Sequence, residues 1–290
     1  MRYLIAAATA APLALAPGAV LAQDMQVSVR TSQDVRRCED LDVTFGGRPA
    51  VTGVEQLTAP GAEKLTIQAA RNGGVYVFGE SRQDFAISVC KAAAPDAAGG
   101  GALEQVRASL TGGSLTARGP GSQGWVVYFI VAAPRQAEIA LEATNGPIHA
   151  AHLGGATTVR SQNGPVKLLD MSGRVSARTQ NGPIAYQGGS GTVDLDAQNG
   201  PLDVRLAGTQ WAGGALTARA QNGPVKLQAP QGFSSGVRVR SSQHSPWNCR
   251  GCDDARRTWD DASRVVEFGS GPVAVTLSTV NGPVAVDLTK

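Results

Sequence analysis

Residues 161–170, "SQNGPVKLLD", contain an Asn-Gly-Pro tripeptide followed by an apolar residue, and this tripeptide recurs along the chain. Asparagine opens it at positions 145, 163, 181 and 199, each 18 residues after the last, and again at 222 and 281. The residues of these corners are Asn145, Gly146, Pro147, Asn163, Gly164, Pro165, Asn181, Gly182, Pro183, Asn199, Gly200, Pro201, Asn222, Gly223, Pro224, Asn281, Gly282 and Pro283. A fixed period of this length indicates an array of repeated structural units.

A glycine stands eight residues before four of these asparagines, at Gly155, Gly173, Gly191 and Gly214. The spacing grows to 23 between Asn199 and Asn222, so the five additional residues lie before Gly214. Insertions in repeat proteins fall in the connections between elements. We therefore expect "LAGTQWAGG", residues 206–214, to form a loop.

Apolar and polar residues alternate after each tripeptide and after each glycine. After Pro165, for example, Val166 and Leu168 flank Lys167. A period of two is typical of a short strand with one buried and one solvated face. Each repeat therefore predicts two short strands.

The tripeptide decides how these strands pair. Asn-Gly between two strands normally indicates a hairpin with a type I′ turn. Such a turn needs the N–H of the residue after glycine, and proline has none. Asn and Gly also tolerate positive φ, and proline sets φ for the strand that leaves the bend. We therefore predict an all-β chain forming a β-solenoid, a single-stranded β-helix of two-strand coils about 18 residues long. An open antiparallel sheet or sandwich is the alternative.

Stacked coils bring identical residues into register. The asparagines can then bond amide to amide along the axis. The glutamines that precede them could do the same, at Gln162, Gln180, Gln198 and Gln221. One outward column reads Arg160, Arg178, Asp196, Arg219, in which the acid relieves repulsion between like charges.

The composition suits a chain of many short strands and tight corners rather than helices. Glycine is abundant, at 36 of 290 residues, while aromatic residues make up only 5%. The apolar start, with small residues before Gln23, predicts a signal peptide at 1–22. The net charge of +3 is too small to indicate nucleic acid as a partner. We expect no transmembrane segment in the mature protein, and location in the periplasm, on the cell surface or outside the cell.

After the signal peptide the chain divides into two regions, and an inserted loop interrupts the second. Residues 23–119 are less regular and predict an N-terminal β cap with the first irregular coils, because a solenoid must shield its open ends. "EKLTIQAA", "GGVYVFGE" and "DFAISVCKAA" are expected strands there, and residues 102–110 either a short helix or a strand. Residues 120–290 contain the repeats, with an inserted loop at about 241–263.

The chain resembles a known bacterial family. The Asn-Gly-Pro or Asn-Gly-Gly corners, the paired-strand unit and "GWVVYFIVAAPRQAEIALEATNGPI", residues 124–148, are similar to DUF4097, a family of candidate adhesins. The resemblance runs from "RNGGVYVFGE", residues 71–80, to the C-terminus. It implies an exported cell-envelope protein with β-helical repeats, and it brings no catalytic motif or cofactor.

The four cysteines of an exported chain predict two disulfides. Of three connectivities, proximity in sequence favours Cys38–Cys90 and Cys249–Cys252. The alternatives for the second pair are a redox Cys-x-x-C and a zinc site with His244. The first lacks a βαβ context and the second lacks a clear fourth ligand, so we expect no metal.

The inserted loop contains the candidate binding residues. Trp247, Arg250 and Trp259, with neighbouring arginines, could form a patch for a sugar or a protein. Packing of the loop against the solenoid is the alternative that we favour.

No set of residues predicts catalysis. Asp194, Asp196 and Asp203 could be imagined as a carboxylate cluster, but carboxylates on a regular outward face are usually solvated. His149 and His152 are expected at the surface. We therefore predict a non-enzymatic cell-envelope protein, adhesin-like or a structural scaffold, with a protein or polysaccharide partner. The alternative is a carbohydrate-binding or carbohydrate-active β-helix of the polysaccharide lyase or hydrolase kind.

Overall fold

The computed structural model describes residues 26–31, 35–61, 64–95, 101–121 and 123–289. The described residues are mainly strand, with a 3-10 helix η1 (Cys38–Asp40) and a short helix α1 (Ala102–Gln105). This confirms the prediction of an all-β chain. The predicted signal peptide, 1–22, lies outside the described residues. None of the described helices combines the length and the apolar character needed to cross a membrane.

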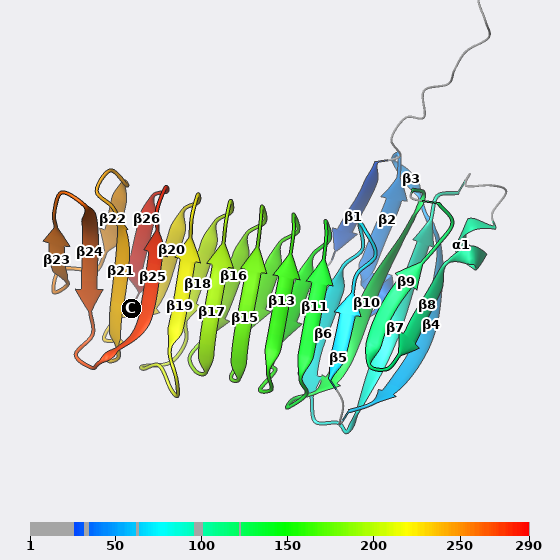
Figure 1. Cartoon of the computed structure of the whole chain (residues 1–290), viewed down its shortest axis with the longest axis horizontal. Coiled ribbons are helices and arrows are strands. Elements are labelled where there is room, and N and C mark those ends of the chain that lie inside the picture. Colours follow the sequence, from blue (N-terminus) through cyan, green and yellow to red (C-terminus); the bar gives the residue numbers. More distant parts are fainter. Residues whose placement is uncertain (1–25, 32–34, 62–63, 96–100, 122, 290) are drawn as a thin grey trace, which may run out of the picture.

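Three sheets contain the strands, and two of them run along the whole molecule (Figure 1). The three-stranded sheet has the order β1 (Val27–Thr31), β2 (Leu41–Phe45), β3 (Arg48–Pro49). The eleven-stranded sheet has the order β22 (Trp247–Arg250), β26 (Val284–Thr289), β20 (Val225–Pro230), β18 (Leu202–Leu206), β16 (Ile184–Gly188), β14 (Val166–Leu169), β12 (Ile148–Ala151), β6 (Val75–Glu80), β10 (Trp125–Pro134), β7 (Asp84–Ala93), β4 (Val51–Pro60). The twelve-stranded sheet has the order β23 (Arg256–Trp259), β24 (Ser263–Phe268), β21 (Gly236–Ser242), β25 (Val273–Thr279), β19 (Leu216–Ala220), β17 (Thr192–Ala197), β15 (Arg174–Thr179), β13 (Thr157–Ser161), β11 (Ile139–Ala143), β5 (Leu65–Gln68), β9 (Ser114–Arg118), β8 (Arg107–Thr111).

From β11 to β20 the chain alternates between the two long sheets, and each of these strands pairs in parallel with its counterpart one repeat away. Val166 of β14 lies beside Ile148 of β12 on one side and Ile184 of β16 on the other. Leu202 continues the same line, and all four side chains are buried. The expected stacking of repeats is confirmed, and antiparallel pairing of these repeats is excluded. The arrangement is consistent with a β-helical fold.

At the corners, backbone hydrogen bonds join neighbouring repeats, and the residue after each proline is the donor. The amide of Val166 donates to the carbonyl of Pro183 in the next repeat, at 2.9 Å, and Ile184 donates to Pro201 at the same distance. The asparagine side chains form a second ladder at the surface. Each Nδ2 donates to the Oδ1 of the preceding asparagine, at distances of 2.7 to 3.1 Å. The members of this ladder are Asn72, Asn145, Asn163, Asn181, Asn199, Asn222 and Asn281.

The corner glycines are needed for space and not for positive φ, which corrects the conformational reason given above. Among the described residues, none of the Asn-Gly-Pro corners has positive φ at its asparagine or glycine. A Cβ on Gly182 would instead lie 2.1 Å from the carbonyl oxygen of Gly164 in the preceding repeat. Because the backbones approach so closely, only glycine fits at this position.

The predicted glutamine ladder does not form. No hydrogen bond between the side chains of Gln162, Gln180, Gln198 and Gln221 occurs in the described part of the chain. Glutamine has one more rotatable bond than asparagine, and ordering it in solvent costs about 1.5–2 kcal/mol. A net gain of about 1 kcal/mol per hydrogen bond does not offset that cost.

The N-terminal region adds strands to both long sheets and covers one outer face. The three expected strands form as β5, β6 and β7, and residues 102–110 form both α1 and most of β8. β5 and β6 stack on β11 and β12 as one more repeat. The three-stranded sheet packs its apolar residues against β6, β7 and β10 around a second core. The disulfide Cys38–Cys90 joins η1 to β7, as predicted.

The C-terminal repeats are interleaved. β25 pairs with both β19 and β21, and β26 pairs with both β20 and β22. After β20 the chain therefore leaves one strand position open in each long sheet and forms β21 to β24 beyond it. β25 and β26 then fill the two open positions. The segment expected as an inserted loop, 241–263, thus contains strands as well as loops, and Pro246 accepts from Val284 as a corner proline does.

The loop predicted between Asn199 and Gly214 is confirmed between β18 and β19. Trp211 in this loop is 6% exposed. Its Nε1 donates to the carbonyl of Gly191 at 3.0 Å, and its ring centroid lies 6.3 Å from that of Tyr186. The insertion therefore contributes an aromatic side chain to the core.

We expect Gly182→Ala to destabilise the protein by about 1–3 kcal/mol or more, because the new methyl group overlaps the carbonyl of Gly164. Gly101→Ala is the matched control, since nothing lies within 4 Å of its Cβ position. Chemical denaturation of both variants measures the difference. Equal stability of the two would contradict the close-approach explanation.

We expect Asn181→Ala, which removes two ladder hydrogen bonds, to cost about 1–2 kcal/mol. Asn281→Ala removes one and should cost about half as much. Gln180→Ala, which removes none, serves as the control. The same denaturation experiment gives the three values, and a loss for Gln180→Ala as large as for Asn181→Ala would rule out a special role of the ladder.

Candidate functional site

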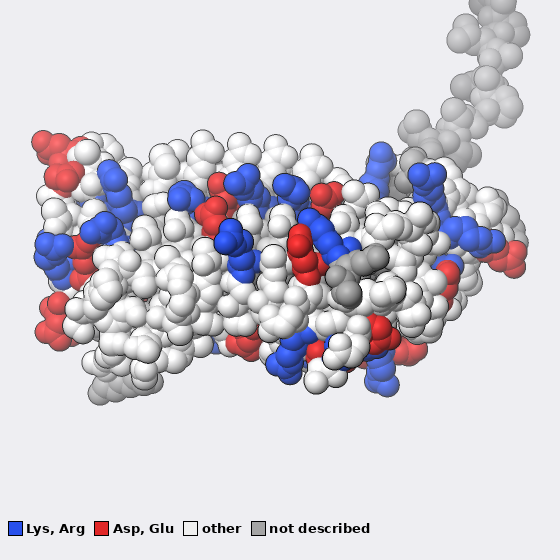
Figure 2. All heavy atoms as spheres, turned by 60° about the horizontal axis from the view of Figure 1, so that its bottom comes forward, with Lys and Arg blue, Asp and Glu red and all other residues white. Residues whose placement is uncertain are grey.

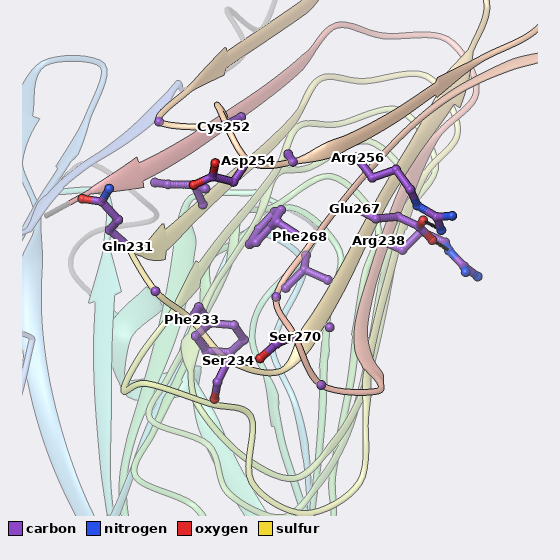
Figure 3. Close-up of a pocket in the computed structure, with 18 of the residues that line it drawn as sticks. Gln231, Phe233, Ser234, Arg238, Cys252, Asp254, Arg256, Glu267, Phe268 and Ser270 are labelled. Carbon is purple, nitrogen blue, oxygen red and sulfur yellow. Dashed lines mark hydrogen bonds and ion pairs between the residues drawn. The ribbon is translucent and has the colours of Figure 1, made fainter.

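A cavity of about 640 Å³ lies at the C-terminal end of the molecule (Figure 3). Three connections line it: residues 230–236 between β20 and β21, residues 251–255 between β22 and β23, and residues 269–271 between β24 and β25. These connections meet because β25 returns between β19 and β21. The interleaved strands thus create the cavity.

One wall of the cavity is charged. Glu267 on β24 lies opposite Arg238 of β21 and Arg256 of β23, and it accepts from Arg238 Nε at 2.6 Å and from Arg256 Nη2. Hydrogen bonds from these two guanidinium groups hold the pKa of Glu267 below its ordinary value. In Figure 3 the three side chains lie together at one side of the cavity. A carboxyl group held ionised in this way is a poor general acid.

The remaining lining is mixed. Phe233 and Phe268 give it an apolar part, Ser234, Ser270 and Asp254 give it hydrogen-bonding groups, and Figure 3 shows these side chains around the opening. Trp211 N donates to Ser235 Oγ at 3.0 Å, which connects the neighbouring insertion to this region. Such a surface can hold a small polar ligand with an apolar side.

The second predicted disulfide, Cys249–Cys252, closes the loop beside the cavity. With both sulfurs bonded to each other, neither is a thiolate ligand for zinc, and His244 is exposed. The described residues contain no group of three or more side chains suited to hold a metal ion.

The predicted binding residues are not brought into one patch. Trp247 and Arg250 stand three residues apart on β22, so their side chains point to opposite faces. Trp247 packs against the core and donates to Ser241 Oγ at 2.6 Å. Arg250 lies 3.9 Å from Asp287 Oδ2, and Trp259, 56% exposed, lies under Arg264 with 5.0 Å between the guanidinium carbon and the ring centroid.

The three aspartates considered as a catalytic cluster do not all lie together. Asp194 and Asp196 lie on β17 of the twelve-stranded sheet, whereas Asp203 lies on β18 of the eleven-stranded sheet. Asp194 is 2.9 Å from Arg219, and Asp203 is 3.9 Å from Lys226. Because the outer faces of the two sheets point away from each other, these groups do not form one site.

The expectation for the histidines is wrong for His149 and fits His152. His149 is 7% exposed, with its ring edge-on to Tyr76 and Phe78. The side chain does point outward from β12, but the three-stranded sheet and its core cover this part of the face. His152 stays partly exposed, 3.6 Å from Asp170.

The group of Glu267, Arg238 and Arg256 was not predicted from the sequence. No spacing signal could have found it, because β24 pairs with β21 in antiparallel register and lies outside the 18-residue period. The corner at Pro246 could have been found from the sequence, because a Ser-Pro dipeptide follows an alternating stretch there and precedes an apolar residue.

Comparison with known proteins gives a distant likeness in structure. No protein-family model and no curated protein matches the chain. A candidate cell adhesion protein from Clostridium sporogenes ATCC 15579 is similar, with 9% identity and a TM-score of 0.36, over 82% of this chain and 99% of that one. A candidate adhesin from Bacteroides fragilis NCTC 9343 has 11% identity and a TM-score of 0.28, over 81% and 96%. At these TM-scores we draw no conclusion about this chain from the two structures, and membership of DUF4097 stays a prediction.

We expect Glu267→Gln to lower the free energy of unfolding at neutral pH by about 1 kcal/mol or less, the range of partly exposed ion pairs. The folded pKa of Glu267 is below its ordinary value of 4.5, so its stabilisation is present above 4.5 and is lost as the pH falls through the lowered folded value. Denaturation from pH 7 downwards should therefore show the two proteins converging. A difference that grows towards acid would contradict this.

Proposed function

We propose that the protein is an exported β-solenoid of the cell envelope with a non-enzymatic, adhesin-like binding or scaffold role. The observation that carries the proposal is the unbroken parallel register from β6 through β12, β14, β16, β18 and β20 to β26. A stack of this kind produces long, regular faces, which suit contact with an extended partner.

Export is supported by the cysteines. Both predicted pairs lie at disulfide distance and no cysteine in the described residues is free. Disulfides form and persist in oxidising compartments such as the periplasm, the cell surface and the medium. A signal peptide at 1–22 would provide the route.

The non-enzymatic role is supported by the state of the acidic side chains. Glu267 is held ionised by two arginines, and Asp194 and Asp203 are on different sheets, each beside a basic residue. A pair of carboxylates for glycoside cleavage needs to flank one bond, with one of them protonated. Asp194 and Asp203 cannot flank one bond because they lie on different sheets, and the lowered pKa of Glu267 makes it unsuited to be the protonated member of such a pair.

A carbohydrate-binding role at the C-terminal cavity is the second candidate. It is favoured by the mixed lining of that cavity and by its contact with the Trp211 insertion. A carbohydrate-active form of this alternative predicts that an incubated polysaccharide is shortened, and that Asp254→Ala, a change in the lining of the cavity, stops the reaction.

We expect a C-terminally tagged chain to appear in the periplasm, at the surface or in the medium of a bacterial host, with its four cysteines unreactive towards a maleimide until reduced. Deletion of residues 1–22 should leave the protein in the cytoplasm with reactive thiols. Fractionation and non-reducing gels give the result. A full-length chain that stays cytoplasmic and reduced would refute the proposal.

A further inference from the structure

The outer face of the twelve-stranded sheet carries a straight row of charged side chains. The register places Arg160 beside Arg178, Arg178 beside Asp196, Asp196 beside Arg219. Ser278 follows Arg219, and Arg240 follows Ser278. We call Arg160, Arg178, Arg219 and Arg240 the arginine row. In the upper half of Figure 2, Lys and Arg side chains follow one another along the long axis.

The arginine row is long, and its members lie one or two strand positions apart. Neighbouring strands of a sheet lie about 4.8 Å apart, so the five steps from Arg160 to Arg240 span roughly 24 Å. The guanidinium groups are accessible: the side chains of Arg160 and Arg219 are 64% and 55% exposed. This length fits several units of a linear polymer and exceeds a single small ligand.

The row is only partly neutralised by the protein itself. Arg160 lies 3.6 Å from Glu142, and Arg219 lies 2.9 Å from Asp194. Arg178 makes no side-chain hydrogen bond or ion pair with any other residue that the structure describes. It is therefore available to an external anion.

Free amide groups run alongside the arginine row. Gln162, Gln180, Gln198 and Gln221 each follow a row position by two residues, so they share its outward side. All four are exposed, and their side chains do not bond to one another. Each offers donors and an acceptor that could bind hydroxyl groups.

The surface is hollowed at one end of the row. A cavity of about 480 Å³ is lined by Gln68, Glu142, Arg160, Gln162 and Gln180, together with residues 69, 143–144 and 161. The hollow therefore brings together the first arginine, two of the free glutamines and the carboxylate that pairs with the arginine. A chain lying along the row could seat one unit here.

We propose that this face binds a linear acidic polysaccharide whose sugars carry carboxylates, with the arginine row contacting the carboxylates and the glutamines contacting the hydroxyl groups. Guanidinium groups pair with carboxylates in a planar, two-point geometry. Asp194, Asp196 and Glu142 lower the positive charge of the face, which disfavours a densely charged polyphosphate. The row positions hold no aromatic side chain, and single-stranded nucleic acid relies on aromatic stacking.

This inference rests on the proposed binding role, and it names the class of partner. The test uses the protein purified after export, with polygalacturonate as the probe and with neutral dextran and double-stranded DNA as comparisons. Affinity is measured by biolayer interferometry at low and at physiological salt. We expect binding of polygalacturonate that weakens with salt, and little binding of dextran.

Two variants of the row have opposite expected effects. Arg178→Gln should weaken the binding of polygalacturonate about two- to fivefold, the size of one exposed ion pair. Asp196→Asn removes a repelling carboxylate and should strengthen it by a similar factor. The matched controls are Lys167→Gln and Asp203→Asn, which make the same charge changes on the outer face of the eleven-stranded sheet and should leave binding unchanged.

Each contrary result overturns a stated part of the inference. Equal effects of the control variants would remove the arginine row as the site. Equal binding of dextran would remove the role of charge, and tighter binding of DNA would replace the polysaccharide with a nucleic acid. No binding of polygalacturonate by a protein that is exported and oxidised would overturn the inference alone, because the fractionation experiment tests the proposed function separately.

Discussion

The hydrogen bond from the residue after each corner proline to a proline carbonyl in the adjacent repeat holds the whole arrangement in register. Ile148, Val166, Ile184, Leu202 and Val225 all donate in this way, each at 2.9 Å. Since proline cannot donate inside its own turn, the chain cannot close a hairpin there, and the neighbouring repeat supplies the bonding. The stacked core, the asparagine ladder and the aligned outer columns all follow from that constraint.

Asparagine and glutamine side chains both end in an amide group, but they behave differently along the stacked repeats. The corner asparagines are short, and the backbone at each corner is fixed by hydrogen bonds to the repeat before it, such as Asn163 N to the Thr144 carbonyl at 2.7 Å. Their amides therefore meet at bonding distance. The adjacent glutamines reach further into solvent and stay separate, which leaves them able to contact a partner. One extra methylene group separates the asparagines that form the ladder from the glutamines that form none.

Much of the fold could be predicted from the sequence, because the 18-residue period, the alternation and the corner proline are local signals. The disulfides followed from the same kind of information. The interleaving of β25 and β26 could not be predicted, since no local signal says that a strand skips a position and a later one fills it. The Glu267 group depends on the antiparallel pairing of β24 with β21 and β23, which lies outside the repeat, and the burial of His149 depends on a sheet formed by residues a hundred or more positions earlier. The candidate site was therefore less predictable than the repeats that support it.

The interleaved end also has a consequence for the order of folding. β21 and β22 are synthesised before β25 and β26, yet in the finished sheets the later strands separate them from β19 and β20. This end of the stack therefore cannot be completed by simple sequential growth, as the preceding repeats can. β25 and β26 are inserted between strands that precede them in the chain, and the neighbour on each side of them opposes fraying.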